Sequence, residues 1–180
     1  RFCFPANRTD VMTEVQNRLT EALGQEFRRR MLDDYIPRIG HCVGLLDSDQ
    51  LWRRPGPTSN SVANLVLHLE GNVRQWIQAG LGGQDDHRQR GAEFAAEQAA
   101  TSTSGALLMQ QLTDTVEEAV QIVTAMNADD YVAVHRFQSR WDETGIAAVI
   151  HVLEHFSGHA GQIYAFTKQE LGIDLQFFDL

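Results

Sequence analysis

Apolar residues recur at intervals of three and four along most of the chain, and this spacing predicts long amphipathic helices. The first predicted helix runs from Met12 to Leu46, with a bend or a restart at Pro37, because proline lacks a backbone donor and crowds the preceding turn. The second begins near Ser59 or Asn60, either of which is a good N-cap, and a cluster of glycines ends it.

The second half of the chain predicts two further helices. Ser102 or Ser104 caps the third helix, which runs to about Met126. The fourth starts within residues 142–144 and ends before Gly172. Because four apolar stripes must each be buried, the simplest fold is an all-α four-helix bundle. The competing fold class is a less regular all-α domain.

Two connecting segments add detail to this prediction. Residues 81–103 form a long connection between helices two and three, with a short helix expected around residues 92–99. Connections of this length are often functional. Residues 131–134 are expected to form a short extended piece before the fourth helix.

The length and the charge of the chain narrow its class. With 180 residues and a mass of 20.2 kDa, we expect one domain at residues 12–180, after a disordered extension at residues 1–11. Lys and Arg number 15 against 24 Asp and Glu, so the net charge is −9. This acidic balance argues against a nucleic-acid binder and against docking on anionic membranes.

The sequence predicts neither secretion nor insertion into a membrane. No run approaches the roughly 18 consecutive apolar residues of a membrane span, and residues 1–5 have no apolar signal core. Cys3 and Cys42 are too few for a disulfide framework and lack the spacing of a cysteine-based zinc site. We therefore expect a cytoplasmic protein with two incidental thiols.

Three of the seven histidines, His151, His155 and His159, follow one another at intervals of four residues near the end of the chain. Residues four apart on an α-helix share a face about 6 Å along its axis, so two imidazoles can converge on one ion. The apolar stripe of this helix continues through His155 and His159, which form the predicted metal-binding pair. His151 is rotated by roughly 40° from His155 and is expected to be an orienting neighbour or a surface residue.

A third ligand is expected from the core face of the second helix, at His68. Three neutral imidazoles from two helices, with the other positions left to water, are typical of an open and catalytic transition-metal site. Zinc is the default ion, and nickel, iron and manganese stay open. The structural alternatives are a satisfied core histidine at position 68 and a chance surface pair on the last helix. His41, His87 and His135 are expected to face solvent.

Other side chains are candidates for lining the same site. Asn72 and Trp76 follow the second-helix histidine by one and two turns. Asn72 either lines the same cavity and orients a ligand or is a capping or helix-contact amide, and Trp76 either lines the cavity or packs in the core. Arg88 and Arg90 come after an acidic loop and form either a salt-bridged lid or a solvated turn.

Two glycines interrupt the predicted metal-binding helix, at Gly158 and Gly161. Each costs about 1 kcal/mol relative to alanine inside a helix. Their presence therefore predicts a close approach of another helix or of a substrate.

The C-terminal segment, residues 155–162, resembles the H-x-x-x-H-x-G-Q helix of the DinB-like superfamily of metal-binding four-helix bundles, also called the YfiT-like group. His68 resembles the solitary histidine of that superfamily's second helix. The likeness covers about residues 12–180. Within the superfamily the chain looks most like an uncharacterised bacterial subgroup, through residues 51–55, 59–62, 68–76 and 88–94.

This resemblance implies a DinB-like fold and a divalent transition metal, with zinc or nickel first, held by His68, His155 and His159. It also implies a homodimer. In some relatives it implies transferase or isomerase chemistry that depends on bacillithiol, mycothiol or glutathione. No residue set in this sequence identifies a particular thiol.

Two functions of different classes fit these observations. The first is a metal-dependent enzyme, in concrete form a transferase that joins a low-molecular-weight thiol to a small-molecule electrophile. The alternative is a non-catalytic metal-binding or stress-related interaction protein, in which the ion ties helix two to helix four. That protein needs a closed site with four ligands, which no other histidine or cysteine is placed to complete. A hydrolase that uses a metal-bound water is a third and more remote interpretation.

Overall fold

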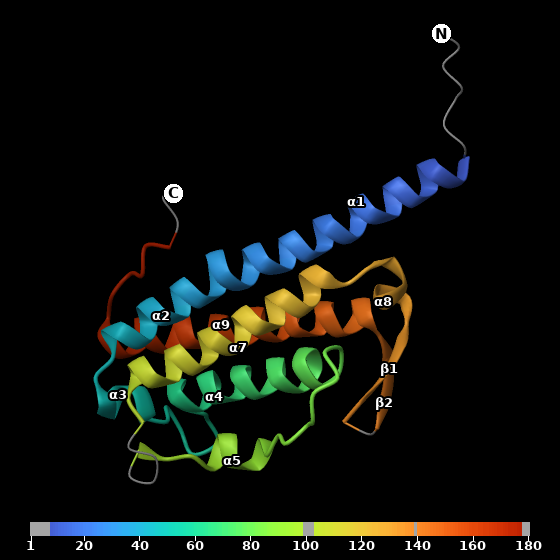
Figure 1. The fold of residues 1–180 in the computed structure, drawn as a ribbon. Helices are drawn as coiled ribbons and strands as arrows, with labels where there is room; N and C mark the ends of the chain where they lie inside the picture. Colours follow the sequence, from blue (N-terminus) through green and yellow to red (C-terminus); the bar gives the residue numbers. More distant parts are fainter. Residues whose placement is uncertain (1–7, 99–102, 139, 178–180) are drawn as a thin grey trace.

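Within the described residues, 8–98, 103–138 and 140–177, the computed structural model contains four long helical rods that lie side by side (Figure 1). In chain order they are α1–η1–α2 (Arg8–Arg28, Arg29–Tyr35, Ile36–Leu45), α4–η2 (Val62–Val73, Arg74–Ala79), α7 (Gly105–Ala125) and α9 (Gly145–Leu171). The shorter elements are α3 (Ser48–Trp52), α5 (Arg90–Ala95), α8 (Ala128–Val132), β1 (Val134–Phe137) and β2 (Trp141–Thr144). The predicted all-α bundle is confirmed.

The first rod stays helical through Pro37 instead of ending there. Its π-helical segment η1 ends at Tyr35, two residues before this proline, and α2 follows without a gap. A π-helical turn shifts the backbone hydrogen-bond pattern, so the helix can continue although proline supplies no backbone donor. The rod begins at Arg8, inside the segment 1–11 that we expected to lie outside the domain. Residues 1–7 are not among the described residues, so the extension stays a prediction.

The second rod begins slightly later than predicted. Its N-cap is Ser61, whose hydroxyl accepts a hydrogen bond from the Asn64 amide at 3.1 Å. In return, Asn64 Oδ1 accepts a hydrogen bond from the Ser61 amide at 3.2 Å. This reciprocal capping box satisfies two donors at once, which explains why the helix starts here rather than at Ser59 or Asn60.

The described part of the connection between the second and third rods contains a helix with other bounds than expected. Helix α5 covers Arg90–Ala95 rather than residues 92–99, of which residue 99 lies outside the described residues. It packs against α4 on the outside of the bundle (Figure 1). Ser104 caps α7 by accepting a hydrogen bond from the Leu107 amide at 3.2 Å, as one of the two predicted caps. The other, Ser102, lies outside the described residues.

The extended piece predicted at residues 131–134 is wrong in its first part, because residues 131 and 132 belong to α8. Asn127 accepts hydrogen bonds from the Asp129 and Asp130 amides and forms a capping box with Asp130. A capping box of this kind starts a helix and here outweighs the β-propensity of the residues that follow.

A hairpin then replaces the predicted start of the fourth helix. Strand β1 pairs antiparallel with β2, and Phe137 lies opposite Trp141. Residues 142–144 are therefore in a strand. Helix α9 starts at Gly145, with Thr144 as the N-cap that accepts a hydrogen bond from the Ala147 amide.

Apolar side chains from all four rods meet between them and form the core. Helix α7 lies against α1, α2 and α4, and α9 lies against α2 and α4. The largest fully buried side chains are Phe27, Phe137, Phe156, Met31, Ile39, Leu51, Leu65, Leu69, Ile77, Leu108, Leu112 and Ile163. No helix in the described part of the chain combines the length and the apolar composition that a membrane crossing requires. The contact between α4 and α9 brings the predicted metal-binding histidines to one place.

Candidate metal centre

The three predicted histidines meet where α4 faces α9. His68 projects from α4, and His155 and His159 project from successive turns of α9. His68 Nε2 lies 2.9 Å from His155 Nε2, and the ring centroid of His159 lies 5.0 Å from that of His68 and 4.5 Å from that of His155. One nitrogen from each ring lies within 4.8 Å of the other two. Imidazole nitrogens around a tetrahedral zinc ion are about 3.4 Å apart, so three such rings could hold one ion.

The surroundings of His155 and His159 favour uncharged rings. Burial, reinforced by the neighbouring His159 and His68, lowers the pKa of His155 to about 3. Burial likewise lowers the pKa of His159. A neutral imidazole keeps the nitrogen lone pair that a metal ligand needs. Among the described residues, no other cluster of His, Cys, Asp or Glu offers three ligand atoms this close together.

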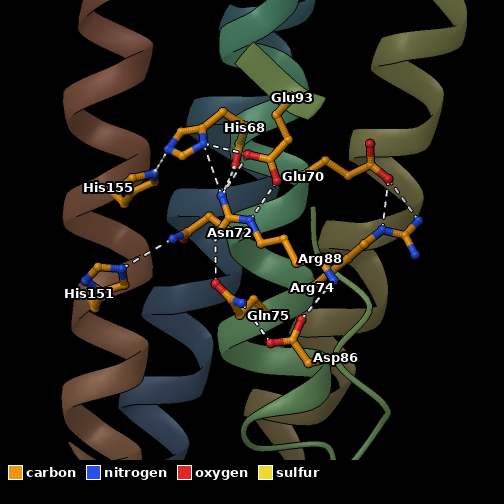
Figure 2. A network of polar contacts seen from close by, with 10 residues as sticks. All are labelled: His68, Glu70, Asn72, Arg74, Gln75, Asp86, Arg88, Glu93, His151 and His155. Atoms are coloured by element: carbon orange, nitrogen blue, oxygen red, sulfur yellow. Dashed lines mark hydrogen bonds and ion pairs between the residues drawn. The ribbon is translucent and has the colours of Figure 1, made fainter. Parts of the chain in front are cut away.

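The connection after α4 supplies a partner for His68 that the sequence did not predict. Glu93 Oε2 lies 2.8 Å from His68 Nδ1 (Figure 2). An ionised carboxylate only accepts hydrogen bonds, so Nδ1 carries the proton and Nε2 keeps the lone pair. Arg88 donates to the same carboxylate, through Nε at 2.7 Å and Nη2 at 3.0 Å. Arg88 Nη2 also lies 3.1 Å from His68 Nδ1, but two donors make no hydrogen bond, so this approach is only a contact.

Glu93 is ionised in this setting. Burial raises the pKa of its carboxyl group, but hydrogen bonds from His68 and Arg88 outweigh that effect and lower the pKa to about 2. The Glu93 side chain is 11% exposed and that of Arg88 is 6% exposed. The ion pair is therefore largely shielded from water.

The other ligands also have neighbours that orient or cover the rings. His159 Nδ1 lies 3.2 Å from Gln162 Oε1, which can accept its proton and leave Nε2 free as a ligand. Gln162 is the last residue of the H-x-x-x-H-x-G-Q segment. The Phe94 ring of α5 packs over the His68 ring at a centroid distance of 4.6 Å.

His151 lies beside the triad, as expected of an orienting neighbour. Its Nε2 is 3.3 Å from Asn72 Nδ2, and its ring centroid is 4.0 Å from that of Trp76 (Figure 2 shows His151 and Asn72). Burial lowers the pKa of His151. Asn72 and Trp76 are both buried, and both also line the cavity beside the triad. For Trp76, core packing and a place in the cavity wall, the two alternatives drawn from the sequence, therefore hold together.

A cavity of about 330 Å³ opens beside the triad. Side chains from α4, η2, α9, the hairpin and the connection line it: His68, Asn72, Trp76, Arg88, Arg90, Gln138, Trp141, Glu143, His151 and His155. A larger cavity of about 520 Å³ touches Arg88 and Glu93 but none of the three histidines. The smaller cavity therefore gives access to His68 and His155. It combines aromatic walls with a few polar groups, as small-molecule sites do.

The remaining sequence predictions have mixed outcomes. His41 and His87 are exposed, as predicted, whereas His135 is half-buried and its Nε2 is buried without a hydrogen-bond partner. No other helix among the described residues closely approaches Gly158 or Gly161, because a Cβ at either position meets nothing within 4 Å, so that part of the prediction is wrong. The approach of a substrate to these glycines stays a prediction. Both glycines lie on the exposed side of α9.

Arg88 forms a buried ion pair, which favours the salt-bridged interpretation of its loop over a solvated turn. The signal for Arg88 and Glu93 was the resemblance of residues 88–94 to the bacterial subgroup. Their separation of five residues matches no helical pair, and Arg88 precedes α5. Their contact depends on how the turn folds back on α4, which helical periodicity does not describe.

Comparison with known proteins identifies the family of the chain and supports its fold. The sequence model of a family described as mycothiol-S-transferase matches residues 28–166, roughly three quarters of the chain. Among solved structures, a DinB-like protein from Bacillus subtilis has a TM-score of 0.60 and 18% identity, over 85% of this chain and 94% of that one. A DinB-like protein from Bacillus cereus has a TM-score of 0.61 and 12% identity, over 81% and 91% of the two chains. At these identities the likeness supports the fold alone, and the predicted DinB-like resemblance is confirmed. No curated protein matches this chain.

Proposed function

Because the chain belongs to the mycothiol-S-transferase family, we propose that it is a metal-dependent thiol S-transferase. His68, His155 and His159 would hold its ion, zinc or nickel. The observation that carries the proposal is the convergence of these three rings beside a cavity of about 330 Å³. When bound there, such an ion lowers the pKa of an adjacent thiol and raises the thiolate population near neutral pH.

The proposed reaction joins a low-molecular-weight thiol, mycothiol in first place, to an electrophilic carbon of a second small molecule. The S–H bond of the thiol breaks and an S–C bond forms. The leaving group departs from that carbon with its electron pair, and the proton of the thiol balances its charge. No oxidant or reductant is required.

The side chains around the cavity bind and orient the two reactants. Trp141, which is 43% exposed, offers a flat apolar surface for the electrophile. The exposed Arg90 guanidinium attracts an anionic group of either reactant. Arg88 is neutralised by its ion pair with Glu93, so it fixes the wall of the cavity instead of binding charge.

The cavity also favours an enzyme over the alternative, a non-catalytic metal-binding or stress-related interaction protein. A structural zinc site is closed by a fourth protein ligand. In the described part of the chain, the cluster of ligand atoms contains the three histidines and no fourth residue. His68 and His155 instead line an opening large enough for a small molecule.

We also propose that the chain forms a homodimer and works in the cytoplasm. The N-terminal half of α1 projects beyond the other rods (Figure 1), and Val15 and Leu19 on it are 52% and 60% exposed. Two apolar side chains four residues apart share one helix face, which suits pairing with a second copy. The cytosol keeps thiols reduced, which supports this location for a thiol-dependent reaction.

The experiment uses protein purified without a metal-affinity tag. Elemental analysis is expected to give about one zinc or nickel ion per chain, and His155→Ala is expected to lose it. Mycothiol, bacillithiol and glutathione are each incubated with a chromogenic aryl halide, with conjugation expected for mycothiol. Chelation should abolish the reaction, and adding back the ion should restore it.

The exposed His87 supplies the matched control, since His87→Ala should keep both the ion and the activity. Conjugation that survives complete removal of the metal contradicts the proposal. So does fully loaded protein that conjugates none of the three thiols.

A further inference from the structure

We propose that Glu93 is a positioning residue for the metal site, and that Gly71 keeps open the space that its carboxylate occupies. Glu93 does not line the cavity beside the triad, so it acts through His68. The inference rests on the metal site of the proposed function and not on the reaction.

The segment that carries Glu93 is anchored on both sides of this residue to the second rod, to α4 on one side and to η2 on the other. Asn64 Nδ2 donates to the Glu93 carbonyl at 3.0 Å and to the Ala96 carbonyl at 2.9 Å. Arg88 Nη1 donates to Gln75 Oε1 at 2.9 Å (Figure 2). Both the main chain and the side chain of Glu93 are thus held in place, and its carboxylate has one position against α4.

That position determines which ring nitrogen of His68 faces α9. The Glu93 carboxylate accepts the Nδ1 proton of His68, which leaves the Nε2 lone pair directed at His155. A second hydrogen bond of this kind selects the tautomer and the ring orientation of a metal-binding histidine, and its loss typically costs 10–100-fold in metal affinity. Because the ion pair with Arg88 is largely shielded from water, solvent competes only weakly for the carboxylate.

Gly71 explains how a carboxylate fits beside a continuous helix. It lies inside α4, where glycine costs about 1 kcal/mol relative to alanine. A Cβ at this position would overlap Glu93 Oε1 and would lie 2.9 Å from Arg88 Nε. An alanine therefore displaces the ends of two flexible side chains and no backbone, so the helix persists while the carboxylate leaves its place.

The test measures zinc affinity, by competition with a chromogenic chelator, and the visible spectrum of the cobalt-loaded protein. Glu93→Gln keeps the shape and removes the charge, and Gly71→Ala displaces the carboxylate. We expect each to weaken zinc binding 10–100-fold and to change the cobalt spectrum. Metal-free Gly71→Ala should still unfold in one cooperative transition, because the added Cβ meets flexible side-chain ends and no backbone. Gly161→Ala is the matched control, because its Cβ meets nothing within 4 Å.

The outcomes separate this inference from the proposed function. Wild-type affinity and spectrum in both Glu93→Gln and Gly71→Ala overturn the role of Glu93 and leave the metal site standing. A wild-type protein that binds neither zinc nor cobalt overturns the metal site itself. If Glu93→Gln fails to fold with Arg88 unpaired, Gly71→Ala decides the question alone, since it keeps every polar group.

Discussion

Replacing Phe137 with alanine should loosen the hairpin that forms one wall of the cavity. Phe137 ends β1, is 1% exposed, and stacks on Trp76 with ring centroids 4.7 Å apart. Trp76 in turn packs against His151. The hairpin carries Trp141 to the cavity, so the stacked pair joins this wall to the helices of the metal site.

The expected loss of stability follows from the packing around Phe137. Truncation of a buried phenylalanine to alanine costs about 3–5 kcal/mol. A Cβ added to Gly80 would overlap the Phe137 ring, so the ring fills its space closely and leaves a cavity when it is removed. For a domain of this size, about 2–4 °C per kcal/mol gives a fall in Tm of roughly 6–20 °C. Urea unfolding and thermal melting, followed by circular dichroism, measure both quantities.

Trp141→Ala provides the matched control for this experiment. Trp141 lies opposite Phe137 in the hairpin but is 43% exposed, so its removal should change the free energy of unfolding by no more than about 0.5 kcal/mol. Both variants should keep one ion per chain and should raise the KM for the electrophile. A loss below about 1 kcal/mol for Phe137→Ala would refute the reasoning that this ring anchors the hairpin.

Zinc added to metal-free protein at about 100 times its dissociation constant should raise the free energy of unfolding by about 2.7 kcal/mol, because the triad exists only in the native state. Thermal melting measures this gain, and an unchanged melting curve contradicts the prediction. Burial raises the pKa of Tyr164 from 10.0 to about 12, so the stability linked to its protonated form is complete below pH 10 and is lost as the pH rises towards 12. Urea titrations should show a smaller loss for Tyr164→Phe over that range, and equal losses would argue against the linkage. Leu19→Glu should convert dimers to monomers in light scattering whereas Gln16→Glu should not, and a Leu19→Glu dimer excludes pairing through α1.

The sequence was most informative where the geometry is local. His155 and His159 could be placed on one face because a regular α-helix relates residues four apart in a known way. His68 required one more step, the assignment of its helix face to the core, and the 2.9 Å approach of His68 and His155 nitrogens agrees with that step. The same local rules predicted the cap at Ser104.

The features that escaped prediction depend on contacts between distant or irregular segments. Strand β2 is polar, and its pairing with β1 is decided by a turn and by the burial of Phe137 rather than by helical spacing. Glu93 reaches His68 from a connection whose path over α4 and η2 depends on the hydrogen bonds from Asn64 to the Glu93 carbonyl and from Arg88 to Gln75. Neither the pairing of the two strands nor the contact between Glu93 and His68 produces a periodic pattern of residues in the sequence.

The most direct test of the metal site is anomalous diffraction from crystals of the zinc-loaded protein, collected at the zinc absorption edge. The account predicts one peak between α4 and α9, about 2.0–2.1 Å from a ring nitrogen of each of His68, His155 and His159. A peak elsewhere on the molecule, or one bonded to α9 alone without His68, would contradict it.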